Sequence, residues 1–569
     1  MKKETKISKV IAGLALSTLA VTTGFSQSNL GAACGCPPVA SRPTVLLSSL
    51  PGFTAINGTY GGELTSGATL TCDNTYIIDQ KIYIPSGKTL NIAPGTVLKG
   101  RANQVVNGTE DKATATALVI MRGGKINAEG SADCQVVFTA EAARLDGTYP
   151  IANKGMWGGV VMLGKATNNL TLAANGPFVP GGSGKLAVAD GLGTIEGFAT
   201  SNTQDQYGAN LSAGESFDDN DNSGVLRYAS IRHSGANLVV GAEINGLTLG
   251  SVGRGTTIDH IEIVSCADDN IEWFGGTVNM KYVASFYGND DMIDFDCGYT
   301  GKNQFFFGLK TDATASADND NGFEMDNDDQ KSNNFPRTNP SFYNVTLIGN
   351  AKSVNTPGGD NSSLAGICAK ELTGGEIYNS IFANFFRGFD LTKSVGTRTG
   401  GSESYHNWST ANGNGTNILK VKCNTFVGCT SPITVGRSTS NVVSADTAQF
   451  YTTDKNVAIA TNTLPGFDYT FTINNTTNTY SKQPDFVPNP AIVVAGCPTP
   501  PVDGFYRAAN YRGAFSSNAG ENWLSNWSYA QVLNITKGLV ACPTDVNGDG
   551  TTNVTDFLQL SSQFGLSCN

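Results

Sequence analysis

Charged side chains are scarce in this sequence. They make up 15% of its 569 residues, whereas a typical globular protein has about 25%. Lysine and arginine, 37 in all, are outnumbered by 48 aspartates and glutamates, which gives a formal net charge of −11. A chain with this deficit of positive charge does not suit nucleic acid or an anionic membrane as a partner. We therefore expect neither of these partners.

The sequence also lacks an apolar run long enough to cross a bilayer, which would need about 20 residues. The run from Val10 to about Val21 is shorter, follows several lysines, and is followed by small residues near Ser26. Such an arrangement is typical of a secretory signal peptide. We expect residues 1–26 to be a cleaved signal, no transmembrane segment, and a secreted protein that is extracellular or attached to the cell surface.

Clusters of metal-binding histidine and cysteine are missing as well. The chain has 3 histidines and 12 cysteines, and no group of them has zinc-binding spacing. All cysteines follow the signal, and an even number in an oxidising compartment favours disulfides over zinc sites. Cys542 and Cys568 are predicted to pair because they flank a short loop–helix segment. Two further predicted pairs are Cys423 with Cys429 and Cys72 with Cys134.

Glycine, by contrast, is abundant, with 67 residues, nearly twice the usual share of about 7%. Short apolar runs rich in β-branched and aromatic residues alternate with Gly, Asn and Asp, which indicates strands joined by turns. Predicted strands include residues 82–84, 89–92, 117–121, 136–138, 160–163, 258–264, 305–309, 345–348 and 418–421. This spacing is compatible with a sandwich, a propeller or a solenoid.

An internal repeat distinguishes among these folds. Residues 258–273 align without gaps on residues 280–295, and the pair Asp268-Asp269 falls on Asp290-Asp291. A period in the low twenties matches one coil of a parallel β-helix, in which successive coils stack. Leucine-rich repeats share the period, but their Leu/Asn consensus is absent. We predict an all-β protein, a right-handed parallel β-helix, with a small calcium-binding loop–helix module at the C-terminus.

The domain organisation follows from these features. We expect a signal peptide at 1–26, an N-terminal leader at 27–70 and the β-helix at 71–500. An aromatic-rich region at 501–540 is predicted to close one end of the solenoid, since terminal coils must be capped. Residues 541–569 form the predicted calcium module.

Several motifs resemble those of exported bacterial β-helix proteins of largely unassigned function. They are residues 271–281 (IEWFGGTVNMK), Asp290-Asp291, residues 301–304 (GKNQ), residues 157–164 (WGGVVMLG) and residues 511–515 (YRGAF). The resemblance spans roughly residues 75–530. It implies the β-helix fold but brings no established activity.

Acidic residues recur at equivalent positions of two successive coils. They are Asp268, Asp269, Glu272, Asp290, Asp291 and Asp294. Stacked coils would bring these carboxylates within about 5 Å of one another, and like charges that close need a cation or a proton between them. One interpretation is therefore a calcium or glycan site. The alternative is that Asp and Asn fill tight turns by bonding their own backbone. Two more acidic stretches, 215–221 and 318–329, are expected to be exposed loops.

A calcium loop stands near the C-terminus. Residues 545–556 (DVNGDGTTNVTD) place oxygen-bearing groups at loop positions 1, 3, 5, 7, 9 and 12 and glycine at position 6, the pattern of an EF-hand with Asp in place of the last Glu. The predicted ligands are Asp545, Asn547, Asp549, Thr551, Asn553 and Asp556. The segment resembles one repeat of a dockerin, which implies a calcium-stiffened module for attachment or sorting.

Two functional hypotheses follow. The first is a non-catalytic extracellular or cell-surface protein for adhesion, glycan binding or envelope architecture, with a polysaccharide or surface protein as partner and calcium as cofactor. The second is a calcium-dependent polysaccharide lyase or glycoside hydrolase. An enzyme would need a basic or histidine partner beside the acidic coils. No spacing in the sequence selects one, so no catalytic residue is predicted.

Overall fold

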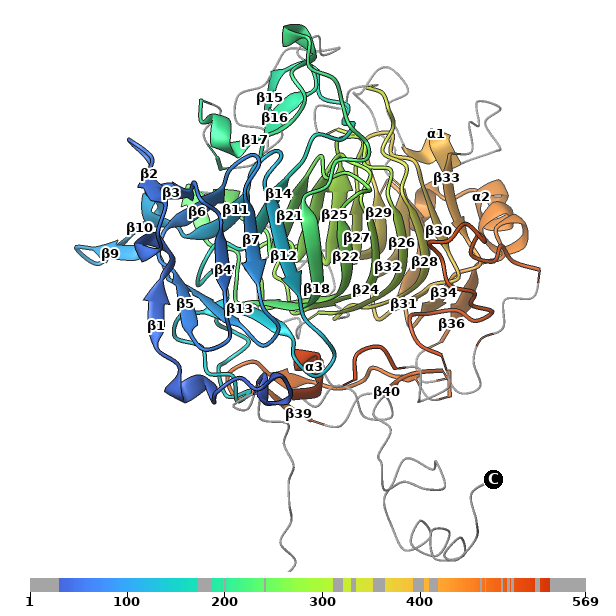
Figure 1. Cartoon of the computed structure of the whole chain (residues 1–569). Helices are drawn as coiled ribbons and strands as arrows, with labels where there is room; N and C mark the ends of the chain where they lie inside the picture. Colours follow the sequence, from blue (N-terminus) through green and yellow to red (C-terminus); the bar gives the residue numbers. More distant parts are fainter. Residues whose placement is uncertain are drawn as a thin grey trace, which may run out of the picture.

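The computed structural model shows a parallel β-helix (Figure 1). It describes residues 30–532 except 172–185, 196, 199–200, 240–241, 311–320, 329–333, 351–363, 392–403, 409–417, 437, 461–462, 466, 482–484, 489–491, 493–495, 517–521 and 526. In this part of the chain two long sheets wind around one apolar core. The predicted fold class, an all-β parallel β-helix, is confirmed.

Sheet I contains seventeen of the described strands. They are β1 (Thr44–Leu46), β4 (Ala68–Leu70), β5 (Thr75–Ile78), β7 (Thr89–Ile92), β8 (Val97–Gly100), β12 (Lys125–Glu129), β13 (Val136–Ala140), β18 (Gly224–Arg232), β22 (Thr257–Val264), β24 (Asn279–Phe286), β26 (Lys302–Leu309), β28 (Ser341–Ile348), β30 (Gly375–Tyr378), β31 (Ile381–Ala383), β33 (Leu419–Lys422), β34 (Thr425–Val427) and β36 (Val457–Ile459).

Sheet II contains twelve of the described strands, all parallel except that β2 runs antiparallel to β3. They are β2 (Phe53–Ala55), β3 (Gly61–Leu64), β6 (Lys81–Ile84), β11 (Ala117–Ile120), β14 (Val160–Leu163), β21 (Leu247–Gly250), β23 (Ile271–Phe274), β25 (Ile293–Asp296), β27 (Phe323–Met325), β29 (Ala365–Ala369), β32 (Arg387–Leu391) and β35 (Ser431–Val435).

Smaller elements lie outside these two sheets. The antiparallel strands are β9 (Gln104–Val106), β10 (Thr109–Asp111), β15 (Leu186–Ala189), β16 (Leu192–Thr194), β17 (Gln206–Gly208), β19 (Asn237–Val239), β20 (Ala242–Glu243), β37 (Phe467–Asp468), β38 (Ile473–Asn474), β39 (Thr479–Tyr480) and β40 (Asp485–Phe486). The α-helices of the described residues are α1 (Ser404–Trp408), α2 (Ser444–Ala448) and α3 (Tyr529–Val532). None of the helices described is long and apolar enough to cross a membrane.

The sequence repeat matches the register in which the strands of successive coils pair. In sheet I, Ile258 on β22 pairs with Met280 on β24, and in sheet II, Glu272 on β23 pairs with Asp294 on β25. Because side chains alternate along a strand, residues on either side of Glu272 point into the core. Ile271 and Trp273 are both fully buried there.

One left-handed residue bends each long strand of sheet I at the same register. Tyr228, His260, Tyr282 and Phe305 have φ values of 45°, 50°, 59° and 59°, which strains a bulky residue. Their rings form a stack with successive centroid distances of 4.4, 4.4 and 5.2 Å. The stacking offsets part of the strain at the corner, because offset aromatic pairs attract one another.

Three disulfides join segments that are distant in sequence. They are Cys34–Cys134, Cys36–Cys72 and Cys423–Cys497. The predictions of Cys423 with Cys429 and of Cys72 with Cys134 are wrong, because the N-terminal segment and a C-terminal segment return to the coils and supply the partners. Cys429 instead lies with its Sγ 3.7 Å from the carbonyl oxygen of Phe382. The predicted Cys542–Cys568 pair lies outside the described residues.

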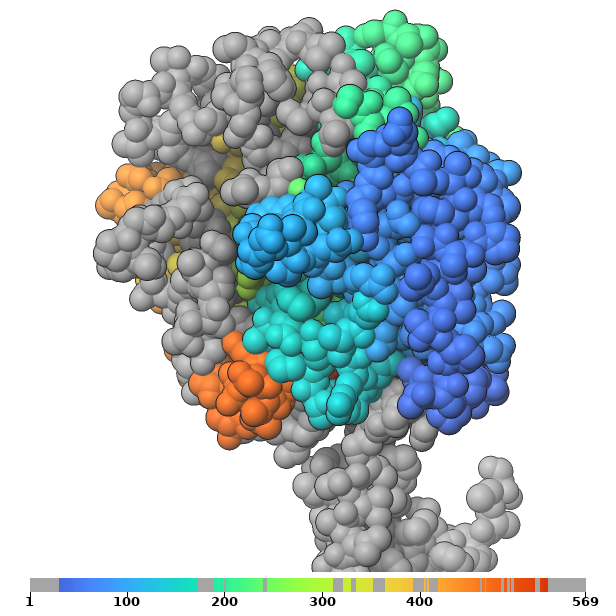
Figure 2. Space-filling model, turned by 90° about the vertical axis from the view of Figure 1, so that its left-hand side faces the viewer, coloured from blue at the N-terminus to red at the C-terminus, as the bar shows by residue number. Residues whose placement is uncertain are grey.

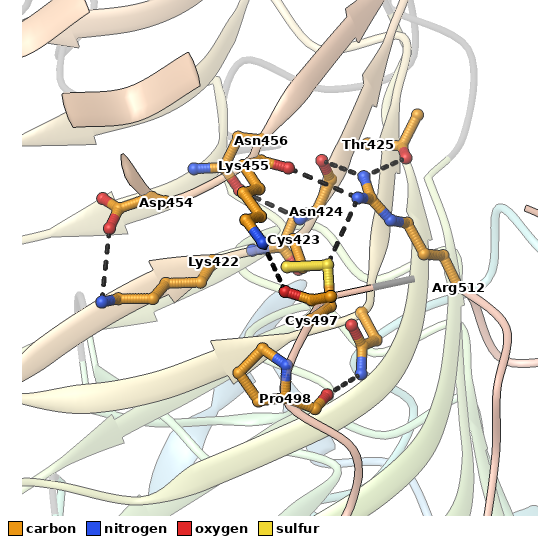
Figure 3. The surroundings of a disulfide bond; sticks show 12 residues. Lys422, Cys423, Asn424, Thr425, Asp454, Lys455, Asn456, Cys497, Pro498 and Arg512 are labelled. Atoms are coloured by element: carbon orange, nitrogen blue, oxygen red, sulfur yellow. Dashed lines mark hydrogen bonds and ion pairs between the residues drawn. A yellow bond between two sulfur atoms is a disulfide. The ribbon is translucent and has the colours of Figure 1, made fainter. Parts of the chain in front are cut away.

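Arg512 reinforces the Cys423–Cys497 attachment (Figure 3). Its guanidinium donates hydrogen bonds to the carbonyl oxygen of Asn424 at 2.8 Å and to the hydroxyl of Thr425 at 3.0 Å. The predicted motif at 511–515 thus contains a side chain that anchors this C-terminal segment to the coil of β34.

The described residues of 503–530, which are 503–516, 522–525 and 527–530, lie along the side of the solenoid, and we call them the C-terminal strap. Asp503 pairs with Lys302, Arg507 donates to the hydroxyl of Tyr282, and the Ala514 N–H donates to Thr346. This differs from the expectation that the aromatic region closes one end. The end of the core is covered by residues 444–453 instead, where buried Phe450 packs 5.3 Å from the ring of Phe426. The helix α3 at the end of the strap is seen in red below the coils in Figure 1.

Candidate functional site

The two Asp-Asp pairs occupy equivalent turns between sheet I and sheet II. One turn joins β22 to β23 and carries Asp268 and Asp269, and the next joins β24 to β25 and carries Asp290 and Asp291. The strands on both sides of these turns pair in register. The turns are therefore stacked on one another along the solenoid.

Stacking brings the predicted carboxylates together. Oxygens of Asp268, Asp269 and Asp290 lie within 4.8 Å of one another, and so do oxygens of Asp269, Glu272 and Asp294. Asp269 belongs to both groups. We call the six predicted residues, which are Asp268, Asp269, Glu272, Asp290, Asp291 and Asp294, the acid cluster.

The acid cluster is buried on one side and open on the other. Asp269, Asp291 and Asp294 are 7%, 4% and 6% exposed, whereas Asp268 and Asp290 are partly exposed. Burial, together with the charges of Asp268, Asp290, Asp291 and Asp294, raises the pKa of Asp269 well above its usual value. Either a proton or a cation must therefore offset the repulsion among these groups.

Backbone contacts show how the turns hold one another. The carboxylate of Asp269 accepts a hydrogen bond of 2.7 Å from the N–H of Asp291, one coil further on. Asp291 accepts in turn from the N–H of Asn321 on the following coil. The side chains of these aspartates thus bond the backbone of the next coil, in addition to any role as ligands.

Two amide side chains extend this network. Asn245, which is 3% exposed, donates from its Nδ2 to the Glu272 carboxylate at 2.5 Å. Asn270 donates to the hydroxyl of Ser285 at 2.7 Å. The buried cluster members Asp269, Glu272 and Asp291 are therefore held in place by hydrogen bonds.

Two lysines adjoin the acid cluster. Lys154, on the segment before β14, donates to the Asn289 side chain at 2.6 Å. The Lys310 ammonium, 3% exposed and at the end of β26, contacts the carbonyl oxygen of Asp290. Burial, assisted by the charge of Lys310, lowers the pKa of Lys154 to about 7. No spacing signal points to Lys154, because it lies far upstream of the acidic coils.

The acidic ladder continues beyond the predicted residues. In sheet II, Asp294 pairs with Glu324 on β27, and Glu324 pairs with Cys368 on β29. Lys370 forms ion pairs with Glu324 and, at 3.5 Å, with Asp326. The expectation of an exposed loop at 318–329 is wrong for 321–328, because Phe323 and Met325 enter the core and their strand is part of sheet II.

His233 and His260 do not form part of the acid cluster. His233 is 1% exposed, and its Nδ1 lies 2.8 Å from the carbonyl oxygen of Asn153. Burial lowers its pKa to about 4, so the ring is neutral near pH 7. His260 belongs to the aromatic stack of sheet I and contacts the carboxylate of Asp259. The predicted calcium ligands Asp545, Asn547, Asp549, Thr551, Asn553 and Asp556 lie outside the described residues.

A family comparison agrees with this architecture. A family model described as "Pectate-lyase like beta helix domain" matches residues 62–463. A solved structure titled "Crystal structure of pectate lyase Pel9A" aligns over 76% of this chain and 88% of that chain, with 11% sequence identity and a TM-score of 0.29. That likeness is too distant to support an argument about activity. No curated protein matches the chain.

Proposed function

The chain belongs to the pectate-lyase-like β-helix domain family, and from this premise we propose that it is an exported protein that binds an acidic polysaccharide through calcium at the acid cluster. Its role would be adhesion, glycan binding or envelope architecture, outside the cell or at its surface. The observation that carries the proposal is the pair of carboxylate triads that share Asp269, with oxygens within 4.8 Å.

The donor set of the cluster fits calcium. This ion prefers six to eight oxygen ligands, including carboxylates and backbone carbonyls, and the cluster offers carboxylate oxygens from two stacked turns. Bound calcium would supply positive charge that the cluster lacks. Asp268, Asp269 and Asp290 would hold it at the partly exposed edge, and Glu272 and Asp294 would hold it further in.

The overall charge explains why a cation is needed for this partner. At the acid cluster, a chain with a net charge of −11 repels an anionic glycan, unless a divalent ion lies between the carboxylates of the two molecules. The partly exposed Asp268 and Asp290 mark the side from which a glycan carboxylate would approach. The three disulfides suit the extracellular compartment where such polysaccharides occur.

The C-terminal loop adds a second calcium site to this proposal. Its ligands would be Asp545, Asn547, Asp549, Thr551, Asn553 and Asp556. By its resemblance to a dockerin repeat, the module would serve attachment or sorting.

Binding of polygalacturonate, measured in calcium and in chelator, tests the proposal. We expect the wild-type protein to bind more tightly in calcium than in chelator, so that chelator removes the calcium-dependent part of the binding, while neutral galactan is not bound. The double variant D269N/D290N should lose calcium-dependent binding. D133N, which changes an exposed aspartate outside the cluster, is the matched control. Equal binding by D269N/D290N and D133N would refute the assignment of the site.

Lys154 favours a second candidate, a polysaccharide lyase. A lysine whose pKa is about 7 is half neutral at neutral pH and can act as a general base. In β-elimination the base takes the proton on the carbon that bears the uronate carboxylate. The C–H electrons form a double bond as the C–O bond to the neighbouring sugar breaks, and the leaving oxygen takes a proton from water.

An absorbance assay separates the two candidates. A lyase releases unsaturated products that absorb in the ultraviolet, whereas a binding protein releases none. If the chain is a lyase, K154M should abolish product release and retain polygalacturonate binding. K125M, at an exposed site on β12, should leave both unchanged. If the wild-type protein binds polygalacturonate and releases no unsaturated product, the non-catalytic role is supported and the lyase candidate is excluded.

A further inference from the structure

A cavity of about 510 Å³ lies beside the first coils. Its lining includes Arg42, Thr44, Thr75, Ile77, Lys99 and Arg144 and no member of the acid cluster. It is therefore a separate feature of the molecule, formed by the N-terminal segment and by the residues that follow β13.

The floor of the cavity is the outer side of sheet I. Thr44 on β1 pairs with Thr75 on β5, and Ile77 follows two residues later on the same face, since side chains alternate along a strand. Lys99 on β8 pairs with Ile77. Residues 39–42 form one wall and residues 141–146 the other. Figure 2 shows these segments, in blue and teal, adjoining at the N-terminal end of the solenoid.

Two cations of the cavity are held in place by backbone carbonyls. Arg42, 6% exposed, donates to the carbonyl oxygens of Leu30 at 2.6 Å, Gly95 at 2.8 Å and Pro37 at 2.9 Å. Lys99 donates to the carbonyl oxygens of Ala143 at 2.8 Å and Glu141 at 3.2 Å. Both positive charges are thus fixed beside the cavity rather than mobile in solvent.

The third cation of the lining, Arg144, has hydrogen-bond donors that are available to a ligand. Arg144 is exposed, and within the described part of the chain its guanidinium makes no hydrogen bond, although its charge helps to lower the pKa of Asp146. The Glu141 carboxylate, by contrast, is engaged by Arg101 at 2.9 Å. The lining therefore carries three cations, Arg42, Lys99 and Arg144, against two carboxylates, Glu141 and Asp146, which is an excess of one positive charge in a chain whose overall charge is −11.

We propose that this cavity is a second binding site, for a carboxylate-bearing sugar, and that it works without a divalent cation. Arg144 would pair with the carboxylate, because a guanidinium matches that group with two parallel hydrogen bonds. Lys99 adds positive charge, Thr44 and Thr75 offer hydroxyls, and Ile77 offers an apolar surface for the sugar ring. The choice of an acidic sugar rests on the proposed function, and the site itself rests on the cavity.

Calorimetric titration with trigalacturonate in chelator is the test, with the full-length protein. The chelator removes the contribution of the acid cluster, so D269N/D290N should still bind under these conditions. R144Q should bind about tenfold more weakly or worse, the loss of one charge-assisted hydrogen bond or more. R144K should be intermediate and K125Q, at an exposed site on β12, unchanged.

K99Q provides a second variant, and its thermal unfolding shows whether the 141–146 wall is still ordered. R144Q remains informative if K99Q unfolds, because Arg144 makes no hydrogen bond within the described residues. The proposal is overturned if trigalacturonate in chelator binds no better than a neutral galactose trimer, or if R144Q binds as well as the wild-type protein. Neither outcome depends on whether calcium-dependent binding is found at the acid cluster.

Discussion

Glu262 on β22 accepts a hydrogen bond of 2.6 Å from the backbone N–H of Tyr529, the first residue of α3, although 267 residues separate them. Glu262 also accepts from the Ser230 hydroxyl at 2.6 Å. The guanidinium of Arg232, on β18, lies 4.0 Å from the centre of the Tyr529 ring. Glu262 and Arg232 are 0% and 1% exposed. Buried charges thus fix the end of the C-terminal strap to sheet I.

The first prediction concerns this contact. E262Q should lower the free energy of unfolding by about 3–5 kcal/mol, because it leaves the charge of Arg232 buried without its partner. Denaturant unfolding measures the loss, and limited proteolysis should cut the strap before the coils. E129Q breaks the exposed ion pair between Glu129 and Arg227 and should change stability by less than about 1 kcal/mol. If E262Q and E129Q lowered the free energy of unfolding by similar amounts, burial of the Glu262 carboxylate would not explain its contribution to stability.

A second prediction follows from Asp205, which is 3% exposed. Burial raises its pKa from 3.8 to about 6, although Tyr83 donates to its carboxylate at 2.9 Å. The folded protein therefore holds the proton more tightly than the unfolded chain between these values. Stability from this group is present below pH 3.8 and lost as the pH rises to about 6, a change of about 3 kcal/mol.

Comparison with D205N isolates this effect. The variant cannot titrate at this position, so the difference in unfolding free energy between wild type and D205N should shift by about 2 kcal/mol between pH 4 and pH 6 and become constant above about pH 7. Urea unfolding at a series of pH values gives this difference. A constant difference across that range would show that the carboxyl group has an ordinary pKa in the folded protein.

Local sequence patterns predicted the coils well. The alignment of residues 258–273 on 280–295 is the observed register, and it also placed Asp268 beside Asp290. Stacking of identical coils is a nearest-neighbour property, so a periodic signal carries it. The non-periodic contacts could not be predicted in this way. The pairing of Cys423 with Cys497 and the approach of Lys154 to Asn289 depend on where segments return to the coils.

A third prediction tests a structural cation at the acid cluster. D290N/D291N should lower the melting temperature in millimolar calcium and have little effect in chelator, because only the folded protein binds the ion. A ligand at 100 times its dissociation constant contributes about 2.7 kcal/mol to stability. Thermal unfolding in both conditions measures the difference. Equal losses with and without calcium would instead indicate that these aspartates act through their backbone hydrogen bonds alone.

The last prediction concerns the C-terminal loop, whose residues lie outside the described part of the chain. Its carboxylates Asp545, Asp549 and Asp556 repel one another without an ion, and extracellular calcium modules bind at about 10⁻⁴–10⁻³ M. In full-length protein that already carries D269N/D290N, calorimetric titration should therefore still show calcium binding in this range. Adding D545N/D549N should remove it, whereas N534D, placed before the loop, should not. If the titration is unchanged by D545N/D549N, the loop does not bind calcium and a polar turn remains the interpretation.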